Sequence, residues 1–401
     1  MQIQAGVGRS GTHDSAKAGR EAAQAAREKL QDAAPAFALV FGTAGHDQDA
    51  LLAGVSAALG PVPLSGCSAE GVITQHGSDE CSHAVAVMAI AAEDVQFRTY
   101  LVSAFAENAA QAAQSLSQQV GEAASSGGLL LVFPDGVQGN CREFIETLEA
   151  GLPADVIIAG GTAGDLLKFE RTYQYHDGQV HTGAVAAVLI TGAFDIELTV
   201  SHGCDLIGLP QTVTKAADGF VHEIDGSPSW EVFKSYLPDD AEGLEAVHVA
   251  HLLLAEHISD GGTSDFGDFT VRVPVKLNQD DGSLYFAAGL TTGTQVQLAL
   301  RNVDKVCERA LGSAQTLIDR RRGERPLLLW QLDCAGRGRL LFDEGPTAPL
   351  IEPMQQIVGK DVPWLGIHTY GEIAPIAGRT FFHNYTGVLC ALYPRRSEGD
   401  G

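Results

Sequence analysis

Apolar runs and amphipathic segments follow one another in the same order three times along the chain. Each copy begins with an apolar run closed by Gly or Asp, which is typical of a buried strand. A segment with apolar residues at helical spacing comes next, and a Gly and a Pro end it. A short strand, a Gly-rich stretch and another apolar run complete the copy. The opening runs are FALVFG at 37–42, LLLVFPDG at 129–136 and LLLWQLDCAG at 327–336.

The Gly-rich stretches hold the same position in each copy: GCSAEGVI at 66–73, GGTAGDLL at 160–167 and GIHTYGEIAPI at 366–376. A unit that repeats along a chain indicates duplication, and strand ends are where open α/β sheets hold ligands. We therefore predict an α/β fold of repeated strand–helix–strand units, in which helices flank mixed sheets and the three turns share one rim. An alternative is that Gly recurs only because each turn needs positive φ angles.

The chain between the second and third copies has a different pattern. Residues 194–225 and 269–300 alternate between apolar and polar positions, as antiparallel strands do, and Asp-Gly pairs at 218–219 and 281–282 mark hairpin turns. The acidic stretch at 237–245 has the composition of a domain boundary. The predicted domains are therefore an N-terminal one at 1–240 and a C-terminal one at 241–401.

The charge of the chain restricts its partners. Its formal net charge of -24 repels phosphate backbones and anionic lipids, so we expect neither nucleic acid nor a membrane as a partner. The N-terminus has no cationic flank before an apolar core, and no apolar run is long enough to cross a bilayer, which indicates a cytoplasmic protein. Seven cysteines without a CxxC pair indicate reduced thiols rather than disulfides or a zinc cage.

Several motifs in a fixed order resemble those of one protein family. They are GCSAEGVI, GGTAGD, HGCDLIGLPQTVTKAADGFVHEIDGSPSWEVF, FTVRVPV, DCAGRGR and GIHTYGEIAPI, with FFHNYTGVLCAL at the end. This combination resembles FIST proteins over nearly the whole chain, with an N-terminal and a C-terminal FIST region. The resemblance implies a sensory module rather than an enzyme, which binds a small ligand such as an amino acid and regulates a signalling partner. Some stand-alone bacterial members resemble haem-binding nitric oxide sensors that control a histidine kinase.

One position departs from the family pattern. Where the first Gly-rich stretch of the family has a Glu, this chain has Val72, and Glu70 lies two residues earlier. The third stretch keeps its acid as Glu372. If the two carboxylates normally hold a cationic ligand together, this change weakens the expectation of an amino acid.

Residue types that can bind a ligand gather at the three turns and in the motifs that follow strands. An Arg in an apolar strand needs an anionic partner, which for Arg272 and Arg337 would be Glu372 or a ligand carboxylate. His368 and His383 are candidates because a rim His can bind an anion, a metal or haem iron, and hydrogen-bonded structural histidines are the alternative. The full set of candidate ligand-binding residues is Cys67, Ser68, Thr162, Asp165, Arg272, Cys334, Arg337, His368, Tyr370, Glu372, His383 and Asn384.

Three other hypotheses rest on single motifs. Haem as a cofactor would need an axial ligand, and the candidates are His248, His251 and His257, which can share a helical face. Cys67 and Cys334 follow strands, where exposed amides can lower a thiol pKa, so a cysteine-dependent hydrolase is an alternative. The GVGRSG segment matches a dinucleotide fingerprint, but the next strand ends without the Asp or Glu that would hold the ribose.

Overall fold

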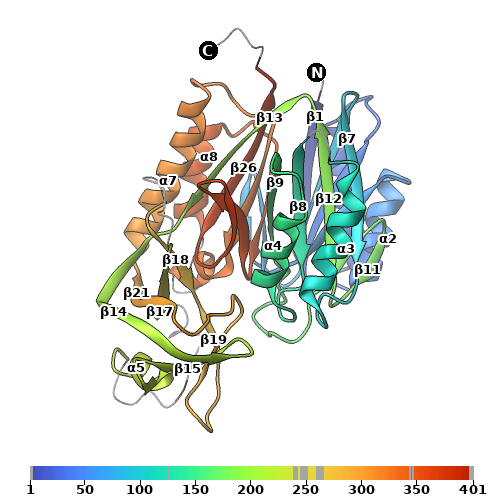
Figure 1. Ribbon diagram of the computed structural model, residues 1–401. Helices are drawn as coiled ribbons and strands as arrows, with labels where there is room; N and C mark the ends of the chain where they lie inside the picture. The colour runs from blue at the N-terminus through green and yellow to red at the C-terminus, as the bar shows by residue number, and fades with distance from the viewer. Residues whose placement is uncertain are drawn as a thin grey trace.

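The computed structural model in Figure 1 consists of a core of three α/β units and a further sheet that is inserted into the third unit. It describes residues 3–124, 127–237, 243, 252–258, 266–342, 345 and 347–396. Within this part of the chain, none of the helices combines the length and the apolar character needed to cross a bilayer.

The three units contain the same succession of elements. The first comprises β1 (Ile3–Ser10), α1 (Ser15–Glu28), β2 (Phe37–Thr43), α2 (Gln48–Leu59), β3 (Leu64–Ala69), β4 (Gly71–Thr74), β5 (Gly77–Asp79) and β6 (Val85–Ala92). The second comprises β7 (Val95–Val102), α3 (Ala109–Gly121), β8 (Gly128–Pro134), α4 (Cys141–Ala150), β9 (Val156–Gly161), β10 (Gln174–His176), β11 (Gln179–His181) and β12 (Val185–Gly192). The third comprises β13 (Phe194–Ser201), α7 (Val303–Arg320), β22 (Leu328–Cys334), η1 (Ala335–Arg337), η2 (Arg339–Phe342), α8 (Ala348–Val358), β23 (Trp364–Thr369), β24 (Glu372–Ile376), β25 (Arg379–His383) and β26 (Gly387–Pro394).

Four strands of each unit pair in the same way. The first strand lies antiparallel to the last, the last lies antiparallel to the second, and the second lies parallel to the third. The resulting orders are β1-β6-β2-β3, β7-β12-β8-β9 and β13-β26-β22-β23. The predicted α/β fold of repeated units is therefore confirmed, and the units form three separate mixed sheets.

The two short strands of each unit do not join their own sheet. The β4-β5 hairpin of the first unit pairs with β23 of the third, and the β24-β25 hairpin of the third pairs with β9 of the second. The β10-β11 hairpin of the second pairs with β3 of the first, which completes the cycle. Because every unit lends a hairpin to another, each sheet has six strands and none of the units is complete alone.

Alternation along the central strands determines the layers. In β2, Phe37, Leu39 and Phe41 belong to a hydrophobic cluster shared by all three sheets, whereas Ala38 and Val40 pack against α1 and α2. The other units repeat this arrangement, with α3 and α4 on the outer face of the second sheet and α7 and α8 on that of the third. Because neighbouring residues of a strand point to opposite faces, a continuous apolar run buries both faces at once. Each fully buried Phe or Leu contributes about 1.5–3 kcal/mol.

The inserted sheet follows β13 and lies below the core in Figure 1. Its strands pair in the order β18-β17-β21-β14-β15-β20-β19, and β16 pairs with β15. The predicted Asp-Gly hairpins are confirmed, since residues 218–219 join β14 to β15 and residues 281–282 join β19 to β20. Most of the acidic stretch at 237–245 lies outside the described residues, and the boundary at residue 240 stays a prediction. The elements are β14 (Cys204–Ala217), β15 (Phe220–Ile224), β16 (Ser227–Pro228), α5 (Ser229–Lys234), β17 (Leu252–His257), β18 (Phe269–Arg272), β19 (Pro274–Leu277), β20 (Leu284–Phe286) and β21 (Gln295–Arg301).

The GVGRSG segment belongs largely to strand β1, so it does not form the turn that a dinucleotide site or a simple Gly-rich loop would need. Helix α1 packs directly on this strand. A Cβ atom at Gly6 would lie 2.1 Å from the carbonyl oxygen of Ala26, and one at Gly8 would lie 2.1 Å from that of Ala22. These glycines therefore allow a helix and a strand to approach closely.

Candidate ligand cavity beside the three turns

The three Gly-rich turns meet inside the core. Backbone N–H groups of the first and second turns donate to carbonyl oxygens of other turns, so each pair of turns is joined by one hydrogen bond. The prediction that the turns lie together is thereby confirmed. The contacts are Gly164 N to Ser68 O at 3.0 Å, Glu70 N to His368 O at 2.9 Å and Thr162 N to Gly371 O at 2.9 Å.

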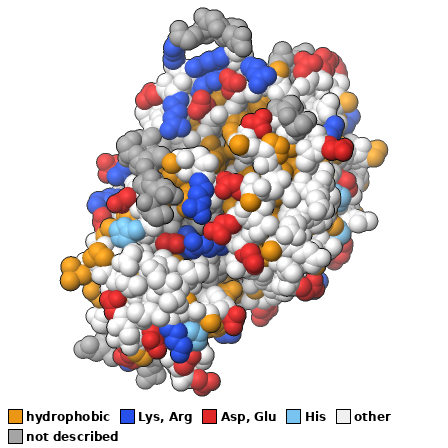
Figure 2. Space-filling view, viewed as in Figure 1, with side chains coloured by type: hydrophobic (Ala, Val, Ile, Leu, Met, Phe, Trp, Pro, Cys, Tyr) orange, Lys and Arg blue, Asp and Glu red, His pale blue; other side chains and the backbone are white. Residues whose placement is uncertain are grey.

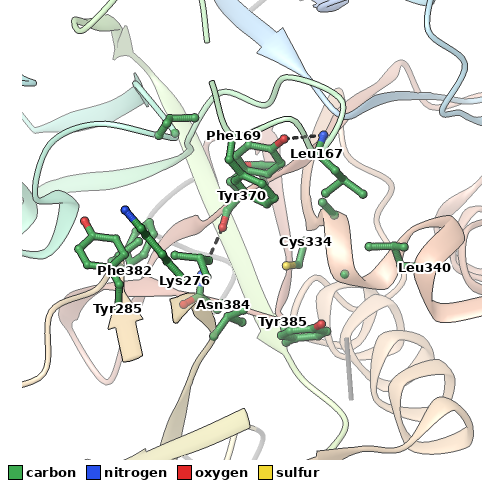
Figure 3. A pocket seen from close by; sticks show the side chains of 18 of the residues that line it. Leu167, Phe169, Lys276, Tyr285, Cys334, Leu340, Tyr370, Phe382, Asn384 and Tyr385 are labelled. Carbon is green, nitrogen blue, oxygen red and sulfur yellow. Dashed lines mark hydrogen bonds between the residues drawn. The ribbon is translucent and has the colours of Figure 1, made fainter. Parts of the chain in front are cut away.

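A cavity of about 590 Å³ lies between the second and third turns and the inserted sheet (Figure 3). The core contributes Cys334 at the end of β22 and Asn384 after β25, and the inserted sheet contributes Lys276. The volume and the largely apolar lining, which includes several aromatic rings, are typical of a small-molecule site. The aromatic residues that line it are Phe169, Phe220, Tyr285, Tyr370, Phe382 and Tyr385.

Tyr370 lies at the centre of the cavity wall. Its hydroxyl donates to Asp165 Oδ1 at 2.6 Å and accepts from the backbone N–H of Leu167 at 2.7 Å. Burial and the nearby charge of Glu70 raise the pKa of Tyr370, so the phenol stays protonated at neutral pH. Asn384 Nδ2 donates to the carbonyl oxygen of Tyr370 at 3.2 Å (Figure 3). These contacts fix the ring that faces the cavity.

Asp165 is absent from the cavity lining and shapes the loop that carries Phe169. Its carboxylate accepts from the backbone N–H groups of Phe169, Glu170 and Arg171 at 2.9, 2.7 and 2.9 Å. Within this loop Phe169 has a φ of 54°, which costs a non-Gly residue free energy. The Phe169 ring stacks on Tyr370 with 4.7 Å between the ring centroids, although 46% of Phe169 is exposed. The loop is thus held in a strained shape that presents an aromatic ring at the cavity.

The two candidate cysteines occupy different environments, and neither is activated. Cys334 lines the cavity, whereas Cys67 lies in β3 within the shared hydrophobic cluster. Burial raises the pKa of both thiols, and the charge of Glu372 adds to the effect at Cys334. Since the thiolate is the nucleophilic form, this environment favours structural thiols over a hydrolase nucleophile.

Arg272 has an anionic partner other than the one expected. Its guanidinium lies 2.6 Å from Glu256 Oε2 rather than pairing with Glu372, and Glu256 also accepts from Arg142 at 3.0 Å. Arg272 Nη1 donates to the carbonyl oxygen of Phe382 at 2.6 Å. Arg272 is absent from the cavity lining, but it joins the inserted sheet to a cavity residue.

Arg337 and Glu372 are buried beside the cavity without lining it. Arg337 Nε lies 2.8 Å from Asp333 Oδ1, and Arg337 Nη1 donates to the carbonyl oxygen of Ser201 at 3.0 Å. Glu372 Oε2 accepts from the backbone N–H and the hydroxyl of Thr386 at 3.1 and 2.8 Å. The anionic partner of Arg337 is therefore Asp333, and not the expected Glu372 or ligand carboxylate.

The buried carboxyl of Glu372 predicts a pH effect on stability. Burial raises its pKa well above the usual value of 4.5, so the folded state holds a proton that the unfolded chain releases. Its contribution to stability is fully present below about pH 4.5 and is lost as pH rises through the folded pKa. We expect Glu372→Gln to lose less stability than the wild type between about pH 5 and pH 8, measured by urea unfolding. Glu122→Gln at an exposed position is the control, and equal pH dependence of Glu372→Gln and wild type would contradict the assignment.

The candidate residues at the third position of each turn are buried in the core, as is His383. Ser68 Oγ donates to the carbonyl oxygen of Gly164 at 2.7 Å, and Thr162 is 2% exposed. His368 Nε2 lies 2.8 Å from Ser78 Oγ, and His383 Nε2 lies 3.0 Å from the carbonyl oxygen of Ala374. Burial lowers the pKa of His383 to about 3, so it is neutral. The alternative of hydrogen-bonded structural histidines is the one these contacts support.

The departure from the family pattern in the first turn has a structural counterpart. Val72 lies in β4 and packs in the shared hydrophobic cluster. Glu70 Oε2 accepts from the backbone N–H of Leu167 at 2.9 Å, and burial raises the pKa of Glu70. The moved carboxylate therefore supports the loop beside the cavity.

Several residues that line the cavity, from both the inserted sheet and the core, are not among the candidates predicted from the sequence. Lys276 directly follows the FTVRVPV motif that contains Arg272, and Phe382 and Tyr385 flank the candidates His383 and Asn384. The sequence pattern does not identify Phe220 and Tyr285 as site residues, because an aromatic residue in an alternating strand usually indicates core packing.

Only one of the three candidate haem ligands, His257, lies within the described residues. His257 lies on strand β17 rather than on the expected helix, and it lines a cavity of only about 80 Å³. His248 and His251 lie outside the described residues. No His lines the larger cavity within the described part, and its Cys334 and Tyr385 have raised pKa values, which disfavour the anionic forms that bind iron.

The protein is thus an α/β protein in which three units interlock and a ligand-sized cavity lies between the core and an inserted sheet. Its sequence matches the model of the FIST N domain over residues 36–227 and that of the FIST C domain over residues 230–375. The chain belongs to the FIST family.

Relatives of similar length occur in mycobacteria. An uncharacterized protein of Mycobacterium tuberculosis is 28% identical over 397 residues, which cover 96% of this chain and 98% of the relative. One of Mycobacterium bovis is 26% identical over 393 residues, which cover 96% of this chain and 97% of the relative.

Among solved structures, a chorismatase aligns over 98% of both chains with 10% identity and a TM-score of 0.38. A cyanuric acid hydrolase from A. caulinodans aligns over 47% of this chain and 71% of its own, with 12% identity and a TM-score of 0.28. Likenesses this weak say nothing about what the chain binds.

Proposed function

We propose that this FIST protein is a non-enzymatic sensor that binds a small molecule and regulates a signalling partner such as a histidine kinase. The observation that carries the proposal is the aromatic cavity of about 590 Å³ between the core and the inserted sheet. A sensor needs a ligand that changes the balance between two states, and a site shared by two parts of a protein provides one. The raised pKa values of the Cys67 and Cys334 thiols support a binding role over a hydrolytic one.

The contacts around Phe382 support a route from the cavity to the inserted sheet. Phe382 lines the cavity from β25, and its carbonyl oxygen accepts from Arg272 of β18. Arg272 pairs with Glu256 of β17, which also pairs with Arg142 of α4. A ligand that displaces Phe382 would therefore act on a buried charge network that joins both parts. A partner that contacts the inserted sheet would detect the change.

A cavity-filling variant tests the proposal. We expect a screen of metabolites, amino acids included, to contain ligands that raise the melting temperature, and a ligand at one hundred times its Kd stabilises the fold by about 2.7 kcal/mol. Ala287 lines the cavity, so Ala287→Trp should abolish the shift. Ala57→Trp on the exposed face of α2 is the matched control and should keep it. A screen in which nothing stabilises the wild type, or in which Ala287→Trp responds equally, would refute the proposal.

A further inference from the structure

We infer that the cavity takes a small aromatic monoanion, such as an aromatic carboxylate, with its ring against Phe169 and its charge near Lys276. The inference rests on the proposed function, because it names the ligand class of the same cavity. The inferred ligand differs from the amino acid that the family resemblance implies, because the cavity offers no partner for an ammonium group.

The charge of the lining favours an anion. The chain carries 50 acidic against 26 basic Lys and Arg residues, and acidic side chains are scattered over the face shown in Figure 2. Yet the described residues that line the cavity include no Asp or Glu, and Lys276 is the one charged side chain among them. A ligand ammonium would lie there without a counter-charge, whereas a carboxylate would find one.

Lys276 is available to such a ligand. It lies exposed on β19, and within the described part of the chain no ion pair involves it. Two other lysines differ in this respect, since Lys17 pairs with Glu21 and Lys305 pairs with Asp205. A single ammonium compensates a single negative charge, so the lining favours a monoanion over a dianion.

The aromatic residues favour a planar ring. Phe169 and Tyr370 stack with ring centroids 4.7 Å apart and an interplanar angle of 25°. Phe169 is 46% exposed although it stacks on Tyr370 and Asp165 holds its loop in place, so part of its surface is available to a ligand. Aromatic rings gain from stacking beyond their buried area. A ligand ring that packs on Phe169 would cover surface that the fold leaves exposed.

Four indole compounds separate the charge from the ring. Indole-3-propionate carries the ring and a carboxylate, indole-3-propionamide carries no charge, tryptamine carries an ammonium, and L-tryptophan carries both charges. By titration calorimetry we expect indole-3-propionate to bind most tightly, the amide about two- to fivefold more weakly, and L-tryptophan and tryptamine more weakly still. Raising the salt concentration should reduce the preference for the anion, because the ammonium is exposed.

Variants assign each effect to a side chain. Lys276→Met should bind the anion and the amide equally, whereas Lys215→Met, at an exposed position of the same sheet, should keep the preference. Phe169→Leu should weaken all four compounds about two- to tenfold. Equal binding of tryptamine and indole-3-propionate, or an unchanged preference in Lys276→Met, would overturn the inference while the cavity still bound a ligand. If none of the four binds, the inference fails, but the proposed function fails only if the wider screen also finds no ligand sensitive to Ala287→Trp.

Discussion

Replacing Arg337 by Leu is expected to lower the free energy of unfolding by about 3–5 kcal/mol. Both Arg337 and Asp333 have side chains that are 0% exposed, and 2.8 Å separates Nε from Oδ1. Without the guanidinium, the Asp333 carboxylate would stay buried without its counter-charge, and the Ser201 carbonyl would lose a donor. Urea unfolding followed by circular dichroism measures the loss.

Two further variants show whether the loss of stability comes from an unpaired buried charge or from a general loss of packing contacts. Arg325 pairs with Asp361 at 2.7 Å, but their side chains are 60% and 75% exposed, so Arg325→Leu should change stability by at most about 1 kcal/mol. The double variant Asp333→Leu with Arg337→Leu removes both charges and should recover part of the loss. If Arg337→Leu is no more destabilising than Arg325→Leu, the buried pair does not act as described.

Local patterns predict the units of this fold but not how they interlock. The apolar run at 37–42 and the helical spacing after it depend on residues close in sequence, so periodicity reveals them. The β4-β5 hairpin, in contrast, pairs with β23, nearly 300 residues further along the chain. The three sheets have similar edges, and the three hairpins are also similar. Packing in the whole core therefore determines which hairpin pairs with which sheet edge. Sequence patterns within one unit carry no information about that choice.

The same contrast between local patterns and long-range pairing explains which residues of the candidate site the sequence can predict. Three candidates, Tyr370, Cys334 and Asn384, line the cavity, because they lie in turns and at strand ends that face it. Arg272 is a candidate ligand residue in the sequence because an Arg in an apolar strand needs an anionic partner. Its anion is Glu256 on the neighbouring strand, and strand pairing within the inserted sheet was unknown from sequence.

Replacing Gly66 by Ala is expected to destabilise the fold by about 2–6 kcal/mol, the sum of a strained φ and a steric overlap. Gly66 has a φ of 146°, and a Cβ atom there would lie 1.8 Å from the carbonyl oxygen of Val40. The two residues are opposite each other in the parallel pair of β2 and β3. The second unit repeats this register, with Gly160 opposite Val132 and 2.0 Å from a Cβ atom to the Val132 oxygen.

Two other glycines allow the backbone cost and the steric cost to be measured separately. The comparison shows why Gly recurs in the turns. Gly77 has a φ of 101° with nothing within 4 Å of an added Cβ, so Gly77→Ala measures the backbone cost, about 1–3 kcal/mol. Gly366 has no strained φ, but a Cβ atom would lie 2.4 Å from the Gln331 oxygen, so Gly366→Ala measures the steric cost, about 1–3 kcal/mol. If Gly66→Ala costs no more than Gly77→Ala in urea unfolding, positive φ alone accounts for the repeated glycine. A larger cost would show that Gly also permits two parallel strands to approach where the three turns meet.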